Sequence, residues 1–186
     1  MIERVSQIIL LCEDEAHERL TKAFLKKCGK KTESPFVKSL VASRMQFGGN
    51  VNWVLNEFPK QLHACRQRRK KAKTLLIVLV DADKFTVEER RRQLLDRVKS
   101  AGYAEFGENE PAVLLIPKHH VETWICALLG MVVKEDEDCK LHKKLKKEDI
   151  RQAAQNLFEW SRPKATLGST CVSSLETALS RWRKIG

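Results

Sequence analysis

The sequence predicts an α/β fold: a doubly wound, mostly parallel sheet with a C-terminal helical extension. Short apolar runs alternate with longer segments of helical periodicity, which is typical of this fold class. The apolar runs cover residues 7–12, 75–80 and 112–116. A strand that is apolar along its whole length is expected where helices cover both faces of a parallel sheet.

The first half of the chain begins with the strand at residues 7–12. Residues 14–28 are predicted to form a helix, because their apolar side chains lie three and four positions apart. Acidic residues come first and lysines last, an order that suits the dipole of a helix. Gly29 is expected to end this helix. Residues 35–42 are expected to form a second strand, although Lys38 interrupts the apolar run.

The central strand, residues 75–80, is preceded by a predicted helix over residues 51–71. The next predicted helix covers residues 86–100. Thr86 precedes its first turn, and Glu89 lies three positions later, which is the spacing of a capping box. Strand and helix therefore alternate through the middle of the chain, as a doubly wound sheet requires.

The last predicted strand, residues 112–116, leads to an apolar helix over residues 121–129. The chain then becomes rich in charge, and the amphipathic stretches 147–160 and 173–182 are expected to be helices. We therefore expect an α/β domain followed by a charged helical tail packed on the core or on a partner, with the boundaries 1–130 and 131–186.

The charge of the chain favours a polyanionic partner. Lys and Arg number 35 against 24 Asp and Glu, a formal net charge of +11. Nucleic acid is favoured over an anionic membrane surface, and over a basic protein with no such partner. The six cysteines form no Cys-x-x-Cys pair, so we expect a reducing, cytoplasmic environment. We expect neither a signal peptide nor a membrane span, because no apolar run is long enough.

Carboxylates follow the predicted strands: Glu13 after the first, Asp81 and Asp83 after the central one, and Glu122 beyond the last. Parallel strands end at one edge of a sheet, so these four side chains are expected to converge there. Residues two apart in extended chain point the same way, which brings Asp81 and Asp83 together. Close carboxylates repel without a cation, and their oxygens suit Mg²⁺ or Mn²⁺. Such ions hold phosphate oxygens and lower the pKa of a bound water.

Each of these acids also has an interpretation without catalysis. Glu13 and Glu122 are acidic residues near the start of a helix, where the dipole favours them. Asp81 and Asp83 suit a solvated turn after a core strand. The functional interpretation therefore depends on the four acids as an ordered set.

Nucleic-acid contacts are predicted at these cationic or polar side chains: Lys84, Lys118, His119, Lys143 and Lys144. Lys118 is the best placed, because it follows a strand and so lies at the same sheet edge as the acids. We do not expect His119 and His120 to bind a metal, since nothing supplies a third soft ligand.

Three short motifs, taken in chain order, resemble those of the Toprim family in its small stand-alone and OLD-nuclease-like forms: Leu10-Leu11-Cys12-Glu13, Val80-Asp81-Ala82-Asp83 and Val121-Glu122-Thr123-Trp124. The resemblance covers about residues 7–129. It implies that Glu13 is a metal ligand or general acid/base, that Asp81 and Asp83 are metal ligands, and that Glu122 belongs to the metal shell. Asp14 departs from the pattern, because many members have glycine there.

We expect a nuclease that depends on Mg²⁺ or Mn²⁺ and acts on DNA or RNA, with DNA favoured. The resemblance implies that it belongs to an anti-phage or mobile-element system and pairs with an ATPase. The chain lacks a Gly-x-x-x-x-Gly-Lys-Ser/Thr motif, so ATP hydrolysis would come from another chain. Two alternatives stay open. One is a binding module that keeps the fold without efficient cleavage. The other is a receiver-like phosphoacceptor domain, in which Asp81 would accept the phosphoryl group and Lys118 would follow a late strand.

Overall fold

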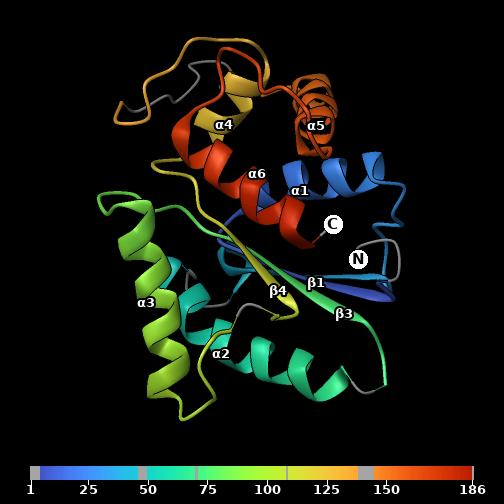
Figure 1. Ribbon diagram of the computed structural model, residues 1–186, viewed down its shortest axis with the longest axis vertical. Helices are drawn as coiled ribbons and strands as arrows, with labels where there is room; N and C mark the ends of the chain where they lie inside the picture. Colours follow the sequence, from blue (N-terminus) through green and yellow to red (C-terminus); the bar gives the residue numbers. More distant parts are fainter. Residues whose placement is uncertain (1–4, 46–49, 70, 108, 138–144, 186) are drawn as a thin grey trace.

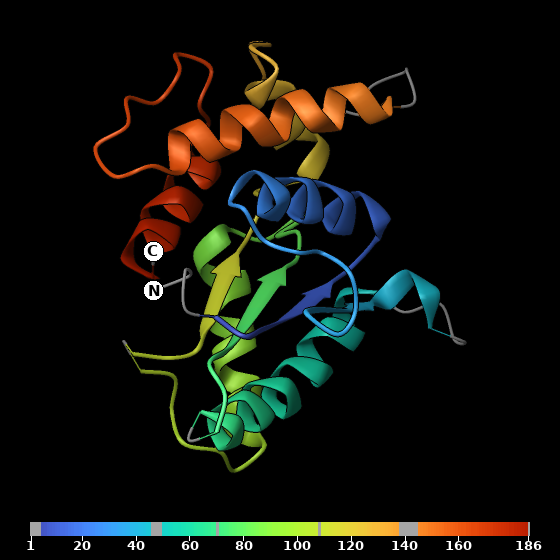
Figure 2. The same cartoon turned by 90° about the vertical axis from the view of Figure 1, so that its right-hand side faces the viewer.

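A computed structural model describes residues 5–45, 50–69, 71–107, 109–137 and 145–185. Its centre is a four-stranded sheet in the order β2-β1-β3-β4, with every neighbouring pair parallel (Figures 1 and 2). The strands are β1 (Gln7–Cys12), β2 (Val37–Val41), β3 (Thr74–Leu79) and β4 (Ala112–Leu115). The predicted α/β class with a parallel sheet is thereby confirmed.

The strand register aligns the carboxyl ends of the strands. Cys12 of β1 lies opposite both Val41 of β2 and Leu79 of β3, and Leu79 in turn lies opposite Leu115 of β4. Each of these residues is the last of its strand. The segments that follow the strands therefore leave the sheet at one edge.

Helices cover both faces of the sheet, as Figure 1 shows. One face carries α2 (Val51–Arg68) and α3 (Val87–Ser100). The other carries α1 (Glu15–Lys27), α4 (Val121–Leu128), α5 (Lys147–Ser161) and α6 (Ser173–Ile185). A short 3₁₀ turn, η2 (Ala42–Arg44), follows β2.

The alternation of side chains in β1 explains why its sequence is apolar from Ile8 to Cys12. Ile8 and Leu10 pack into the core beneath α1, whereas Ile9 and Leu11 pack into the core beneath α2. Successive residues of a strand point to opposite faces, and both faces of this sheet are covered. Each fully buried Leu or Ile contributes about 1.5–3 kcal/mol relative to an exposed one.

The C-terminal helices pack on the body of the molecule. The Trp182 ring of α6 lies edge-on to Phe24 of α1, with centroids 4.8 Å apart. Asn156 of α5 donates a 2.6 Å hydrogen bond to the carbonyl of Leu128, at the end of α4. Residues of the predicted tail thus share one apolar cluster with the predicted domain. Among the described helices, none combines the length and the hydropathy that crossing a bilayer demands.

Candidate metal site

The carboxyl edge of the sheet holds a turn that carries two of the predicted acids. Asp81 is 5% exposed and follows the end of β3, and Asp83 lies two residues further on. The backbone of Asp83 is left-handed, with a φ of 53°, a conformation that Asp adopts more readily than most residues. The two carboxylates therefore meet through a turn, and not through the two-residue period of a strand.

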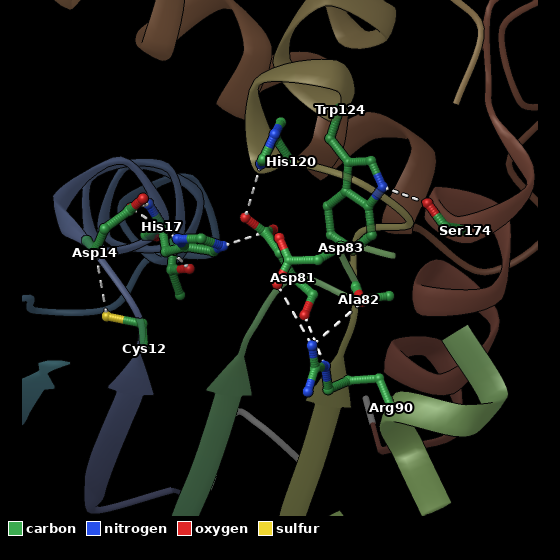
Figure 3. Close-up of polar contacts among 11 residues, drawn as sticks. Cys12, Asp14, His17, Asp81, Ala82, Asp83, Arg90, His120, Trp124 and Ser174 are labelled. Carbon is green, nitrogen blue, oxygen red and sulfur yellow. Dashed lines mark hydrogen bonds and ion pairs between the residues drawn. The ribbon is translucent and has the colours of Figure 1, made fainter. Parts of the chain in front are cut away.

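Arg90 of α3 fixes this turn from below. Its buried guanidinium donates to the backbone carbonyls of Asp81 (2.9 Å) and Ala82 (3.2 Å), and lies 3.4 Å from an Asp83 carboxylate oxygen (Figure 3). One rigid cation thus satisfies two buried carbonyls and partly balances the charge of the turn.

His17 of α1 links Asp81 to Asp14. Its Nε2 lies 2.9 Å from Asp81 Oδ1, and its Nδ1 lies 2.7 Å from Asp14 Oδ1 (Figure 3). Burial alone would lower the pKa of His17, but the charge of Asp81 and the hydrogen bonds to both carboxylates outweigh it and raise this pKa to about 10. The charged imidazole lowers the pKa of Asp81 despite its burial, and lowers that of Asp14 to about 2.

His120, which precedes α4, completes a compact group of possible ligands. Its Nδ1 lies 3.6 Å from Asp81 Oδ2, the carboxylate oxygen that faces away from His17. One ligand atom from each of Asp81, Asp83 and His120 lies within 4.8 Å of the other two. The group is drawn from the ends of β3 and β4, in the position where doubly wound sheets bind ligands.

Glu13 follows β1 and lies close enough to Asp81 and Asp83 to feel their charge. Burial and the negative charge of Asp81 raise the pKa of Glu13 to about 7. Its Oε2 is buried and has no hydrogen-bond partner among the described atoms. An unpaired carboxylate oxygen beside two other acids is the arrangement that a cation or a proton would stabilise.

The other predicted side chains among the described residues belong to the segments that follow β3 and β4. Glu122 occupies the first turn of α4 and does not belong to the group within 4.8 Å. Lys118 donates a 3.2 Å hydrogen bond to the carbonyl of Phe85, and the ring of His119 stacks on His120 with centroids 4.3 Å apart.

Lys84 is exposed, with its Nζ 5.8 Å from the centroid of the Phe85 ring. Lys143 and Lys144 lie outside the described residues.

The donor set fits a divalent cation. Asp81 Oδ1 is taken by His17, so Asp81 would bind an ion through Oδ2, beside a carboxylate oxygen of Asp83 and a ring nitrogen of His120. Two carboxylates suit Mg²⁺ and Mn²⁺, whereas an imidazole is a more usual ligand for transition metals. The combination therefore fits Mn²⁺ better than Mg²⁺.

The predictions from sequence assigned no role to His17 or Arg90 and did not include His120 among the metal ligands. The sequence did indicate that His17 and Arg90 would be buried. His17 lies on the same apolar side of its helix as Leu20, and Arg90 lies on the same apolar side of its helix as Leu94. A titratable group on such a stripe must find polar partners when it is buried. The sequence contains no such indication for His120, because the residues beside it, Asp81 and Asp83, follow a different strand.

Comparison of the chain with protein-family models, with curated proteins and with solved structures finds no match.

Proposed function

We propose that the protein is a divalent-metal-dependent hydrolase of phosphodiester bonds in nucleic acid. The observation that carries this proposal is the group formed by Asp81, Asp83 and His120, whose ligand atoms lie within 4.8 Å of one another at the carboxyl edge of the sheet. The Toprim resemblance of the motifs around Glu13 and Asp81 supports the same function.

The roles of the residues follow from their positions. Asp81, Asp83 and His120 would hold the ion, which when bound supplies a Lewis acid for a phosphate oxygen and an activated water. Glu13, with its unpaired buried Oε2, would serve as a further ligand or accept a proton from the attacking water. His17 and Arg90 would keep the Asp81 carboxylate and its turn in place.

Nucleic acid is the proposed substrate because of the charge of the chain. The net charge is +11, and Lys84 and Lys118 belong to the segments that leave the same edge of the sheet. Lysine binds phosphate as a point charge, which gives affinity without base specificity. The role in anti-phage defence and the ATPase partner rest on the Toprim resemblance alone.

The test is cleavage of plasmid DNA and of RNA with Mg²⁺, Mn²⁺ or EDTA. We expect cleavage with Mn²⁺ that EDTA abolishes, and a loss of at least about 100-fold in Asp83→Asn. Asp83 is the informative site, because its side chain is 40% exposed and asparagine keeps its size and tolerates the left-handed backbone. Asp96→Asn, an exposed acid of α3, is the matched control and should cleave at the wild-type rate.

Two outcomes would contradict the proposal. Equal rates for wild type and Asp83→Asn would show that the activity comes from elsewhere. Absence of cleavage by the wild type, with nucleic-acid binding retained, would favour the binding module.

A receiver-like phosphoacceptor is the second candidate, favoured by the strand order, which matches the first four strands of the doubly wound order 2-1-3-4-5. The geometry argues against it. The Asp81 oxygens face His17 and His120, and Lys118 contacts the Phe85 carbonyl. Labelling by a small phosphodonor that is lost in Asp81→Ala would support this candidate over hydrolysis.

A further inference from the structure

A cleft of about 670 Å³ lies between α1 and α5, away from the metal site. Figure 2 shows α1 between the sheet and α5, so the cleft is on the side of α1 that faces away from the sheet. His17 and Leu20 point to the buried side of the same helix. The body of α1 therefore separates the cleft from the carboxylates at the strand ends.

The walls of the cleft are strongly basic. Six of the lining residues are cationic and none is acidic: Arg19, Lys22, Lys26, Lys27, Lys147 and Arg151. Four of the six have acidic partners outside the lining, of which the closest are Glu18 to Lys22 at 2.7 Å and Glu15 to Arg19 at 2.8 Å. The pairs of Arg19, Lys26 and Arg151 are exposed on both sides and contribute only about 0–1 kcal/mol each, so an anionic ligand can replace them at little cost. Lys22 keeps its partner, because the Glu18 carboxylate is only 6% exposed.

The floor of the cleft is apolar. Ala23 of α1, Ile150 of α5 and Leu145, which precedes α5, line it alongside the cations. No aromatic side chain lines it among the described residues, so it offers no platform for stacked bases. A ligand that matches this surface needs apolar groups in the middle and negative charges at the sides.

We propose that this cleft binds an acidic amphipathic helix of a partner protein. Helices of this kind place their apolar face in a groove and their charges along its rim. On α1, Arg19, Lys22 and Lys26 are three and four positions apart and span about 10 Å at 1.5 Å per residue. The bound segment therefore has two to three turns, with leucine-like residues on one face and glutamates flanking them. This proposal does not depend on the metal site.

The test measures binding of a fluorescent 12-residue peptide that carries leucines on one helical face and glutamates on either side of it. The full chain is compared with two double variants that change the net charge equally. Lys26→Glu with Lys147→Glu alters the cleft, and Arg97→Glu with Lys99→Glu alters the exposed end of α3. We expect at least a tenfold loss of affinity in the first variant and less than a twofold loss in the second.

Methyl NMR of the full chain locates the bound peptide. The methyl signals of Ala23 and Ile150 should shift on its addition, and a scrambled peptide of the same composition should bind at least tenfold more weakly. Equal losses in the two variants, no binding, or equal binding of the scrambled peptide would overturn the proposal. Displacement of the peptide by a single-stranded oligonucleotide, with larger shifts at these methyls, would also overturn it in favour of nucleic acid.

Discussion

At the scale of single residues, several buried or half-buried charges are held by partners from other segments of the chain. Arg90 binds the carbonyls of the turn at Asp81, and His17 connects Asp81 to Asp14. Arg66 of α2 shows the same behaviour far from the candidate site. It donates to the Glu110 carboxylate (Nε to Oε2, 2.9 Å) and to the carbonyls of Ala104 and Glu105, which attaches the loop before β4 to α2.

The Arg66–Glu110 pair predicts how stability depends on pH. Burial would raise the pKa of Glu110, but hydrogen bonds from Arg66 and Gly107 and the charge of Arg66 lower it below its ordinary 4.5. A lowered pKa in the folded state means that the pair stabilises the protein above about pH 4.5 and ceases to do so as the pH falls through the folded-state pKa. Glu110→Gln should therefore reduce the free energy of unfolding by about 1–2 kcal/mol at pH 7.

The measurement is urea denaturation of wild type and Glu110→Gln at pH 7 and near pH 3.5. The difference between them should shrink at the lower pH. Glu105→Gln, on the same loop but exposed, is the control and should change little at either pH. A difference that stays constant with pH would show that the Glu110 charge contributes nothing.

At the scale of elements, α6 completes the core above the sheet. Leu175 is 0% exposed, and Trp182 packs on Phe24 of α1. Trp124 of α4 donates a 2.7 Å hydrogen bond to Ser174 at the start of α6 (Figure 3), and Ser174 in turn contacts Glu135. Because α6 shares an apolar cluster with α1 and α4, we expect it to unfold together with the sheet.

Leu175→Ala should reduce the free energy of unfolding by about 2–5 kcal/mol, since it leaves a cavity in a closed core. Ser180→Ala, at an exposed position of the same helix, should change it by less than about 0.5 kcal/mol. Circular dichroism and tryptophan fluorescence should report one shared transition in both variants. Separate transitions for the two probes would instead show that the C-terminal helices form an independent unit.

At the scale of the whole molecule, the sheet joins the candidate ligands to the stability of the fold. Asp81 and His120 come from different strand ends, so the site exists only when the sheet is formed. A cation that binds the folded state alone must therefore raise the melting temperature. The site and the α1–α5 cleft lie on opposite sides of α1, which allows them to be tested separately.

Mn²⁺ at about one hundred times its dissociation constant should add about 2.7 kcal/mol to the free energy of unfolding, or roughly 5–10 °C to the melting temperature of a chain of this size. The shift should be lost in Asp83→Asn and kept in Asp96→Asn. Differential scanning calorimetry with and without EDTA measures it, independently of any cleavage. An equal shift in both variants would place the ion elsewhere on the molecule.

The sequence by itself determined the sheet and its edge. Short continuous apolar runs that alternate with helical segments favour strands covered on both faces, so β1, β3 and β4 and the acids that follow β1 and β3 were predictable from local pattern. Two acids placed two residues apart were also enough to predict that Asp81 and Asp83 would meet, although a left-handed turn brings them together.

Only the tertiary structure decided the partners of those acids. His17, Arg90 and His120 reach Asp81 from α1, α3 and the start of α4, three segments separated by dozens of residues in the chain. It also decided that Glu13 lies close enough to Asp81 and Asp83 for burial and their charge to raise its pKa, whereas Glu122 occupies the first turn of α4. Local periodicity fixes which face of an element is buried, but contacts between elements depend on packing, which no local pattern encodes.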